Sequence, residues 1–496
     1  MTSPLSRREL LRSAAFAWPA LPALFSDDPY RPALIRRERP GAAVRIRGRV
    51  HAAGRGLPGV AVSDGRSVVA TDRTGRYELV TTGERRFVSV SVPAGHELPV
   101  SDTATARAFA RIEPGRAEQQ HDFGLAPLVG GDERHAFLLL SDVQTENPTD
   151  MRRFEAESVP DVAATIAGLG DRPLFGVADG DIMWDHLALY DDYERATRQL
   201  GIPFVQVVGN HDLDLDARTD EASTATFQRR FGPRYWSFNR GQIHYVVLDD
   251  VLYYGGGYIG YLDDEQLAWL QADLALVERG TPVVVFAHIP ITSTLWKRRG
   301  EARPAPAQAL TNREALFRAL EGHRALLLTG HIHESDHLEE SGTVERCHGT
   351  VCGGWWTGDI CYDGTPNGYG VYEVDGSEIT WRYKSTGRPD DHQIRVYPRG
   401  ADPRAPEEIV ANVWAWDPGW SVVWYQGADR RGLMSRRVGF DPLAMEKLAG
   451  PDLPATRGWV DPIPTGHLFY APISPGASDV RVEATDPSGR RYTARL

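Results

Sequence analysis

The sequence is poor in cysteine and lysine, and it has no long apolar run. Three cysteines among 496 residues are too few for a fold held together by disulfide bonds. No stretch approaches roughly 18 consecutive apolar residues, so we expect no transmembrane anchor in the mature chain. Positive charge is also scarce, because 55 basic residues face 67 acidic ones and the net charge is −12. An acidic chain of this kind is unsuited to a stable nucleic-acid partner.

The rest of the composition is that of a globular protein, and the apolar pattern divides it into three regions. Hydrophobic residues make up 42% and charged residues 25%. Short alternating runs indicate β-strands in 41–130 and again in 394–496, where Val413–Trp416 and Val422–Tyr425 are examples. In 131–385 apolar runs alternate with helical segments, which is typical of an α/β layered core. We expect helices near 151–169, 185–200, 264–279 and 312–321, and hairpins at 235–249 and 370–383 that make the sheets mixed.

The first 40 residues resemble a twin-arginine export signal and its linker. Arg7 and Arg8 precede a modest apolar segment that ends near Phe25. The alternative interpretation is a basic N-terminal tail that carries no export signal. If the signal is present, we expect an extracytoplasmic protein that is periplasmic, on the cell surface or secreted. The sequence does not define where the signal is cleaved.

The three cysteines lie close together, at Cys347, Cys352 and Cys361. An exported protein could join Cys347 to Cys352 as a disulfide, and the alternative is three small buried side chains. No C-x-x-C pair is present, so these residues do not form a zinc site.

Five apolar runs in the central region end in side chains that can bind a metal ion. In layered α/β folds ligands gather beyond the carboxyl ends of the strands, so these side chains are expected to meet. Glycine precedes three of the groups and permits close approach. The runs are FLLLSDVQ with Asp142 and Gln144, PLFGVADGD with Asp181, FVQVVGNHD with Asn210, His211 and Asp212, VVVFAHIP with His288, and LLLTGHIH with His331 and His333.

The order of these motifs resembles the calcineurin-like metallophosphoesterase family. The flanking regions resemble the subgroup that has an N-terminal transthyretin-like β-sandwich (41–130) and a C-terminal β domain (394–496) around the catalytic domain (131–385). The resemblance implies an α/β (α+β) layered core with mixed sheets between two all-β, sandwich-like domains. One departure is Gln144, which stands where most members have histidine; its amide oxygen can still bind a hard or borderline cation.

The resemblance also implies roles for these residues. One metal ion would take Asp142, Gln144, Asp181 and His333, and a second would take Asp181, Asn210, His288 and His331. The mixed oxygen and nitrogen donors suit Mn, Fe or Zn. His211 would act as the general acid, and Asp212 would orient its imidazole. Asp185 is interpreted as a helix cap.

We therefore expect an exported, dinuclear-metal phosphoric ester hydrolase. Its export favours a phosphodiester substrate derived from the cell envelope, in which a metal-activated hydroxide attacks phosphorus. The alternatives are a phosphomonoesterase or phosphoprotein phosphatase, and a cell-surface binding protein without catalysis. Trp355 and Trp356 follow the last histidine motif, where they either line the substrate site or pack in the core.

Overall fold

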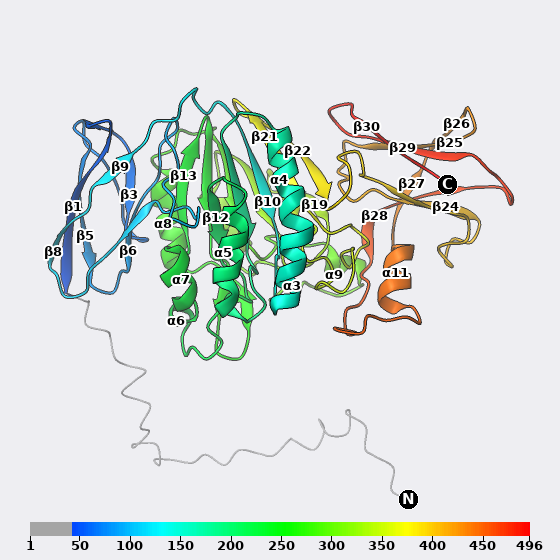
Figure 1. Cartoon of the computed structure of the whole chain (residues 1–496), viewed down its shortest axis with the longest axis horizontal. Coiled ribbons are helices and arrows are strands. Elements are labelled where there is room, and N and C mark those ends of the chain that lie inside the picture. Colours follow the sequence, from blue (N-terminus) through cyan, green and yellow to red (C-terminus); the bar gives the residue numbers. More distant parts are fainter. Residues whose placement is uncertain (1–41) are drawn as a thin grey trace, which may run out of the picture.

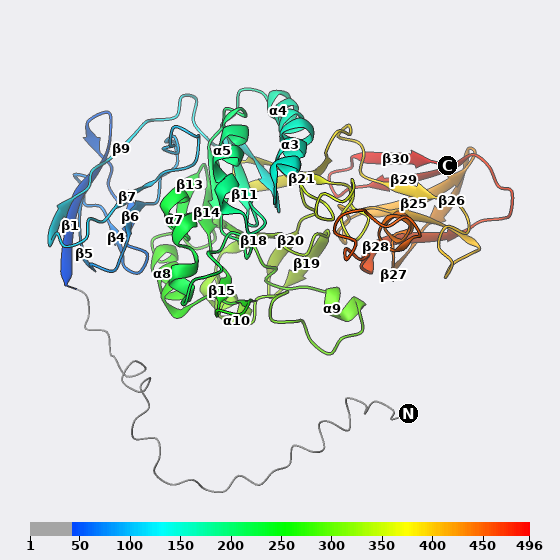
Figure 2. The same cartoon turned by 60° about the horizontal axis from the view of Figure 1, so that its bottom comes forward.

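The computed structural model describes residues 42–496 and arranges them in three consecutive regions (Figure 1). We call them the N-terminal module (β1–β9), the core (β10–β22) and the C-terminal domain (β23–β30). They follow one another along the long axis of the molecule in both ribbon views (Figure 2). Among the described residues no helix combines the length and apolarity needed to cross a membrane. The proposed signal, with Arg7 and Arg8, lies outside the described residues.

The N-terminal module is a small β-sandwich. In β1 and β5 buried and exposed residues alternate, as expected for strands with one face in a core. One sheet has the order β2-β1-β5 with β8 and β9 also paired to β1, and the other has the order β4-β3-β6-β7. The strands are β1 Ala43–Ala52, β2 Arg55–Gly56, β3 Ala61–Ser63, β4 Val68–Ala70, β5 Arg76–Thr82, β6 Phe87–Val90, β7 Phe109–Arg111, β8 Glu118–Gln120 and β9 Phe123–Leu125.

The core contains two mixed sheets. The first has the order β12-β11-β10-β21-β22, in which β10, β11 and β12 are parallel. The second has the order β13-β14-β17-β18-β20-β19, in which β14, β17 and β18 are parallel. The strands are β10 Arg134–Leu140, β11 Leu174–Asp179, β12 Phe204–Val207, β13 Trp236–Arg240, β14 Ile243–Val247, β17 Pro282–Phe286, β18 Arg324–Thr329, β19 Asp336–Glu340, β20 Thr343–Cys347, β21 Gly368–Asp375 and β22 Glu378–Ser385, with a separate hairpin of β15 Val251–Tyr253 and β16 Tyr258–Gly260.

Helices cover the outer faces of both sheets, so the core has four layers. On β10, Phe137 and Leu139 face the second sheet, whereas Leu138 and Leu140 face the helices. Asn147 and Asp263 cap two of these helices by accepting backbone N–H bonds. The helices are α3 Pro148–Arg153, a π-helical turn Phe154–Ser158, α4 Val159–Gly168, a 3₁₀ turn Leu187–Leu189, α5 Tyr190–Arg198, α6 Asp220–Ser223, α7 Ala225–Phe231, α8 Asp264–Leu274, α9 Leu295–Arg298 and α10 Arg313–Ala319.

The C-terminal domain is a second β-sandwich, with sheets ordered β23-β24-β28-β27 and β26-β25-β29-β30. Asp441 caps its helix α11, and Pro442 occupies the first turn. The elements are β23 Arg395–Tyr397, β24 Glu408–Asn412, β25 Ser421–Gln426, β26 Asp429–Leu433, β27 Ser435–Gly439, α11 Pro442–Ala449, β28 Thr465–Pro472, β29 Val480–Thr485 and β30 Arg491–Arg495.

The expected fold class, a layered core with mixed sheets between β-rich flanks, is confirmed. One expected strand is wrong: Val413–Trp416 forms a turn after β24, where Trp414 is fully buried. Alternation of apolar residues indicated a strand there, but the indole side chain fills a gap beside Tyr383 instead. The short helices α6, α7, α9 and α11 were not expected, because each is less than three turns long and gives little periodic signal.

Candidate metal centre

The candidate ligands follow five strands whose carboxyl ends meet at one side of the core. Three of the strands belong to the first sheet and two to the second, so the site lies between the sheets. The ligands that follow them are Asp142 and Gln144 after β10, Asp181 after β11, Asn210 after β12, His288 after β17, and His331 and His333 after β18.

Most of these residues have a strained backbone. Asp142, Gln144, Asp181, His331 and His333 all have positive φ angles, between 46° and 71°. Such angles are uncommon for residues other than glycine and cost free energy unless the surroundings enforce them. Their concentration in one place indicates that the fold has been selected for the position of these side chains.

Two glycines allow the loops that carry the ligands to approach one another. A Cβ on Gly209 would lie 2.2 Å from Oδ1 of Asp181, and one on Gly330 would lie 2.4 Å from Oδ2 of Asp142. Any larger residue at these positions would push a candidate ligand out of place.

Around Asp181, donors from both sheets point to a common position. Oδ2 of Asp181 lies 3.2 Å from Nε2 of His288, which also lies 3.2 Å from Oδ1 of Asn210. Donor atoms of Asp181, His288 and His331 all lie within 4.8 Å of one another. His331 bonds the carbonyl of Ala307 through Nε2, which leaves Nδ1 free to act as a ligand.

Asp142 forms the centre of the second group. Its Oδ1 lies 3.4 Å from Nε2 of His333, and its Oδ2 accepts the backbone N–H of His331. Gln144 donates from Nε2 to Oδ2 of Asp181 at 2.9 Å, while its Oε1 faces the thiol of Cys352 at 3.4 Å. Because the two ends of an amide have nearly the same shape, a half-turn of this group would direct the oxygen toward Asp181.

The residues fit a metal ion. Oδ1 of Asp142, Nδ1 of His331 and Nε2 of His333 are buried and have no hydrogen-bond partner within residues 42–496. Buried polar atoms are normally paired, and three orphans that converge on one site indicate a ligand that satisfies them. Carboxylate, amide oxygen and imidazole together suit Mn, Fe or Zn.

The charges of neighbouring groups shift the pKa values of the candidate ligands strongly. Burial alone would raise the pKa of Asp181, but His288 and His211 lower it well below the usual range. Burial would lower the pKa of His288, yet the charge of Asp181 raises it to about 10. Burial and the nearby His288 lower the pKa of His331 to about 4. His331 is therefore neutral at neutral pH and ready to bind a metal ion, whereas His288 would release its proton when a metal ion binds.

His211 is oriented by Asp185 and not by Asp212, so that expectation is wrong. Nδ1 of His211 lies 2.9 Å from Oδ1 of Asp185, and the backbone N–H of His211 donates to Asp181. Asp212 instead joins the loops that follow β11 and β12. Its carboxylate accepts hydrogen bonds from the backbone N–H groups of Ile182, Met183 and Gly209 and from the hydroxyl of Tyr190.

The interpretation of Asp185 as a helix cap is therefore also wrong. The following 3₁₀ turn has no side-chain cap, and φ is positive at Asp185. The signal that could have identified Asp185 is its place four residues after Asp181, on the same loop. Burial would lower the pKa of His211, but Asp181 and Asp185 raise it and favour the protonated ring.

Two further groups of residues surround the centre. Trp355 lies at the site, with its ring 5.2 Å from His211, whereas Trp356 is buried in the core. The three cysteines are buried free thiols, so the disulfide between Cys347 and Cys352 is absent from the structure. Sequence reasoning missed Trp184 and Trp459, which contact Trp355, because neither lies in a metal-binding motif.

Comparison with protein-family models matches all three regions. The calcineurin-like phosphoesterase model matches residues 135–335, the model for the N terminal of calcineurin-like phosphoesterases matches 44–128, and the model for their C terminal matches 345–492. The chain belongs to the calcineurin-like phosphoesterase family. The C-terminal match begins within β20, so it includes strands that complete the core sheets as well as the β-sandwich.

Curated relatives match about a third of the chain. Purple acid phosphatase 15 from Arabidopsis thaliana is 32% identical over 34% of this chain and 30% of its own length. The serine/threonine-protein phosphatase CPPED1 from Bos taurus is 30% identical over 29% of this chain and 49% of its own length. The chain thus spans about a third to a half of the length of these relatives. A solved dimetal phosphatase from Danio rerio covers 52% of this chain and 97% of its own, with 16% identity and a TM-score of 0.35.

Proposed function

We propose that this protein is a dinuclear-metal phosphoric ester hydrolase. The observation that supports it best is the convergence of unpaired donors from both sheets on the shared carboxylate of Asp181. Asp142, Gln144, Asp181 and His333 would hold one ion, and Asp181, Asn210, His288 and His331 the other. When bound, two such ions neutralise the phosphoryl oxygens and acidify a water molecule.

His211 supplies the proton for the leaving group in this proposal. Its ring is held by Asp185 at Nδ1, so Nε2 is left to face the departing oxygen. The charges of Asp181 and Asp185 raise the pKa of His211 and so favour the protonated ring that a general acid requires. A positioned acid of this kind contributes about 10²–10⁴-fold to the rate.

A phosphodiester from the cell envelope is the substrate that we favour, on the ground of the twin-arginine sequence. The names of the relatives, purple acid phosphatase and serine/threonine-protein phosphatase, support a phosphomonoesterase as the second candidate. A binding protein without catalysis is the third, and the unpaired buried donors are difficult to reconcile with it.

Metal analysis with a substrate pair tests the proposal. The purified protein is expected to hold two transition-metal ions and to hydrolyse a nitrophenyl phosphodiester faster than the monoester. Asp181→Asn should lower both occupancies together, whereas Asp191→Asn, an exposed acid on α5, should lower neither. One ion per chain, or one ion unaffected in Asp181→Asn, would contradict the shared carboxylate.

Export is tested separately. Replacement of Arg7 and Arg8 by lysine should retain the protein inside the cell, because the twin-arginine pathway requires the pair. Unchanged export on fractionation would contradict this part of the proposal and leave the enzymatic part intact.

A further inference from the structure

Three tryptophans from separate parts of the chain meet beside the metal centre, and we call them the aromatic corner. The ring of Trp184 lies 4.2 Å from that of Trp355 and 5.9 Å from that of Trp459. Trp355 and Trp459 lie 5.0 Å apart. The three rings stand at 64° to 74° to one another, so each meets its neighbours edge to face.

The aromatic corner lies on the side of the site where the leaving group departs. Trp355 stacks on His333 at 5.3 Å and meets His211 edge-on at 5.2 Å. Trp184 also meets His211, at 6.1 Å. A phosphoryl group at the metal centre would therefore have its leaving oxygen beside His211 and the remainder of its alcohol next to these rings.

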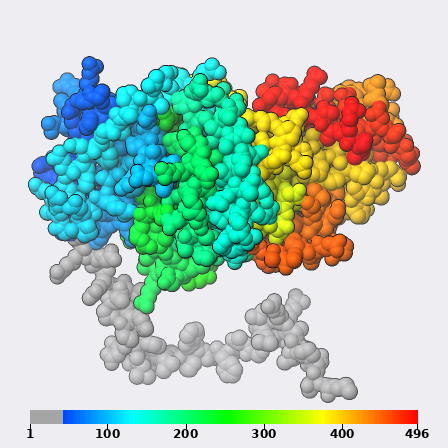
Figure 3. Space-filling view, in the orientation of Figure 1, coloured from blue at the N-terminus to red at the C-terminus, as the bar shows by residue number. Residues whose placement is uncertain are grey.

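The third ring belongs to the C-terminal domain, in the loop 450–464 between α11 and β28. Arg457 anchors this loop by pairing with Glu146 at 2.7 Å and with Asp150 at 2.8 Å, and it lies over the ring of Trp184 at 4.4 Å. Val460 is buried a few residues further along. In the space-filling view the orange part of the chain, which contains this loop, abuts the side of the core (Figure 3).

Trp459 remains 54% exposed although the residues around it are fixed. An indole that only packed the loop in place would be buried, as Val460 is. Here the loop is held by the ion pairs of Arg457 and by Val460, so the exposed face of Trp459 adds no comparable stability. Exposed apolar surface of this kind next to a functional site indicates a binding contact.

We propose that the aromatic corner binds the leaving alcohol and that this alcohol is a carbohydrate. The inference rests on the proposed phosphoester hydrolase. No two of the rings are parallel, so they cannot enclose a planar base, whereas the exposed part of the Trp459 indole can pack against the C–H face of a sugar ring. Arg457 donates to Oε2 of Glu146, a side chain that is about half exposed, so its other oxygen can accept a hydrogen bond from a sugar hydroxyl.

Calorimetry with non-hydrolysable ligands tests the aromatic corner without turnover. The ligands are a glucose that carries a methylenephosphonate at C6, n-heptylphosphonate and benzylphosphonate, each added to the metal-loaded full chain. The wild type should bind the glucose derivative most tightly. Trp459→Ala should weaken that binding about tenfold, leave heptylphosphonate unchanged, and be largely rescued in Trp459→Phe. Leu453→Ala is the matched control, because Leu453 is a similarly exposed apolar residue, 50% exposed, in the same loop.

The outcomes separate the two proposals. Equal weakening of the glucose and heptyl ligands in Trp459→Ala, or no weakening, would overturn the aromatic corner even if the enzyme hydrolyses phosphoesters. Tighter, Trp459-dependent binding of benzylphosphonate would overturn the carbohydrate assignment. Binding of the glucose ligand that depends on Trp459, in a protein that hydrolyses no phosphoester, would support the aromatic corner and refute the proposed catalysis.

Discussion

The two flanking β-sandwiches cover opposite edges of the core, and they do so in different ways. The N-terminal module lies along β12 and β13, the edge strands at one end of the two sheets. The C-terminal domain lies against β22 and β19, the edge strands at the other end. Both domains thereby protect strand edges that would otherwise invite pairing with another chain.

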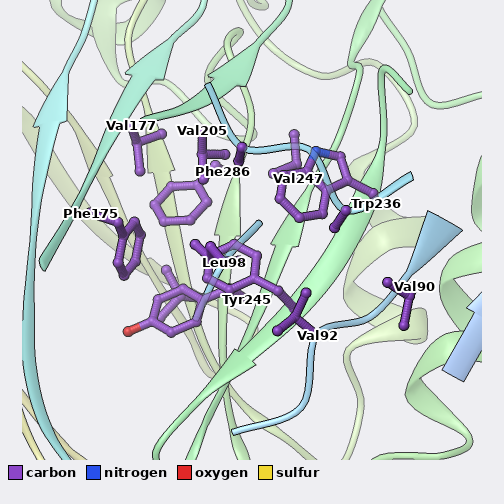
Figure 4. Close-up of a cluster of buried hydrophobic side chains, with 14 of the residues drawn as sticks. Val90, Val92, Leu98, Phe175, Val177, Val205, Trp236, Tyr245, Val247 and Phe286 are labelled. Carbon is purple, nitrogen blue, oxygen red and sulfur yellow. The ribbon is translucent and has the colours of Figure 1, made fainter. Parts of the chain in front are cut away.

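The N-terminal contact, which we call the N seam, is a continuation of the core. Val92 pairs with Phe238 and Thr105 with Phe204 as short parallel bridges, so the backbone ladder extends into the module. The apolar cluster between the core sheets also continues into the module, where Val90, Val92 and Leu98 pack toward Trp236 and Tyr245 (Figure 4). This contact fixes the sheets and touches none of the candidate ligands.

The C-terminal contact, the C seam, combines small apolar clusters with buried polar groups and reaches the metal centre. The main apolar cluster of the C-terminal domain is its own and does not continue between the core sheets. Asp363 accepts a bond from the backbone N–H of Ser335, two residues after His333, and pairs with His467 of β28 at 2.9 Å. A polar contact has defined geometry, so the C seam can position catalytic loops in a way that an apolar contact cannot.

The largest expected effect comes from breaking the C seam at Asp363. Asp363→Ala removes a fully buried carboxylate that serves four donors, and we expect a loss of about 3–5 kcal/mol in the free energy of unfolding. Activity should fall with it, because the loop after His333 loses its anchor. Chemical denaturation and kcat/KM check both effects.

A matched change in the N seam should dissociate stability from activity. Val92→Ala removes buried apolar volume and should cost about 2 kcal/mol without altering kcat/KM. Asp363→Asn, which keeps the shape of the side chain, covers the case in which Asp363→Ala does not fold. A loss of activity in Val92→Ala as large as in Asp363→Asn would remove the distinction between the two contacts.

The second prediction compares two aspartates on the loops next to the aromatic corner. Asp185→Asn should lower kcat about 10- to 100-fold with both metals retained, because His211 loses the partner that raises its pKa. The alkaline limb of the pH–rate profile, where His211 loses its proton, should move to lower pH. Asp212→Asn should instead lower the thermal midpoint, since Asp212 holds backbone N–H groups. A kinetic defect in Asp212→Asn at unchanged stability would restore the rejected role.

The strand ends and their ligands could be expected from the sequence because each is a short local pattern, an apolar run followed at once by a donor. The aromatic corner could not, because it depends on contacts between distant segments. Trp459 reaches Trp184 only through the path of the loop 450–464, which no local pattern encodes. The turn at Val413–Trp416 was misjudged for the same reason, since tertiary packing of Trp414 overrides the alternation.

The third prediction concerns acid sensitivity at the two seams. Burial lowers the pKa of His135, near the N seam, to about 4 and that of His348, near the C seam, to about 3. In the unfolded chain each of these histidines binds a proton below the ordinary pKa of 6.5, whereas in the folded chain it stays neutral until a much lower pH. The free energy of unfolding therefore decreases as the pH falls below 6.5. At pH 5 each of the two buried histidines should lower the free energy of unfolding by about 2 kcal/mol.

Glutamine variants of each histidine check this assignment. His135→Gln and His348→Gln should each lose about 2 kcal/mol less than the wild type between pH 7 and pH 5 in urea denaturation. An exposed histidine, His186, serves as the control, and His186→Gln should follow the wild type. An unchanged pH dependence in either buried variant would mean that the ring is protonated in the folded protein.

The smallest expected effect is a polar deletion in the N seam. The buried hydroxyl of Ser91 accepts a bond from Ser237 at 3.0 Å, across the contact between the module and β13. Ser91→Ala leaves Ser237 without that partner and should cost about 1 kcal/mol. The double variant with Ser237→Ala should recover part of the loss, because both partners are then removed together.

Activity should not respond to these changes. The hydrogen bond between Ser91 and Ser237 is a buried polar contact like those of Asp363, but it lies far from the candidate ligands, so kcat/KM should not change in either variant. A fall in kcat/KM in Ser91→Ala would show that the N seam also positions the metal centre, and would remove the functional distinction between the two seams.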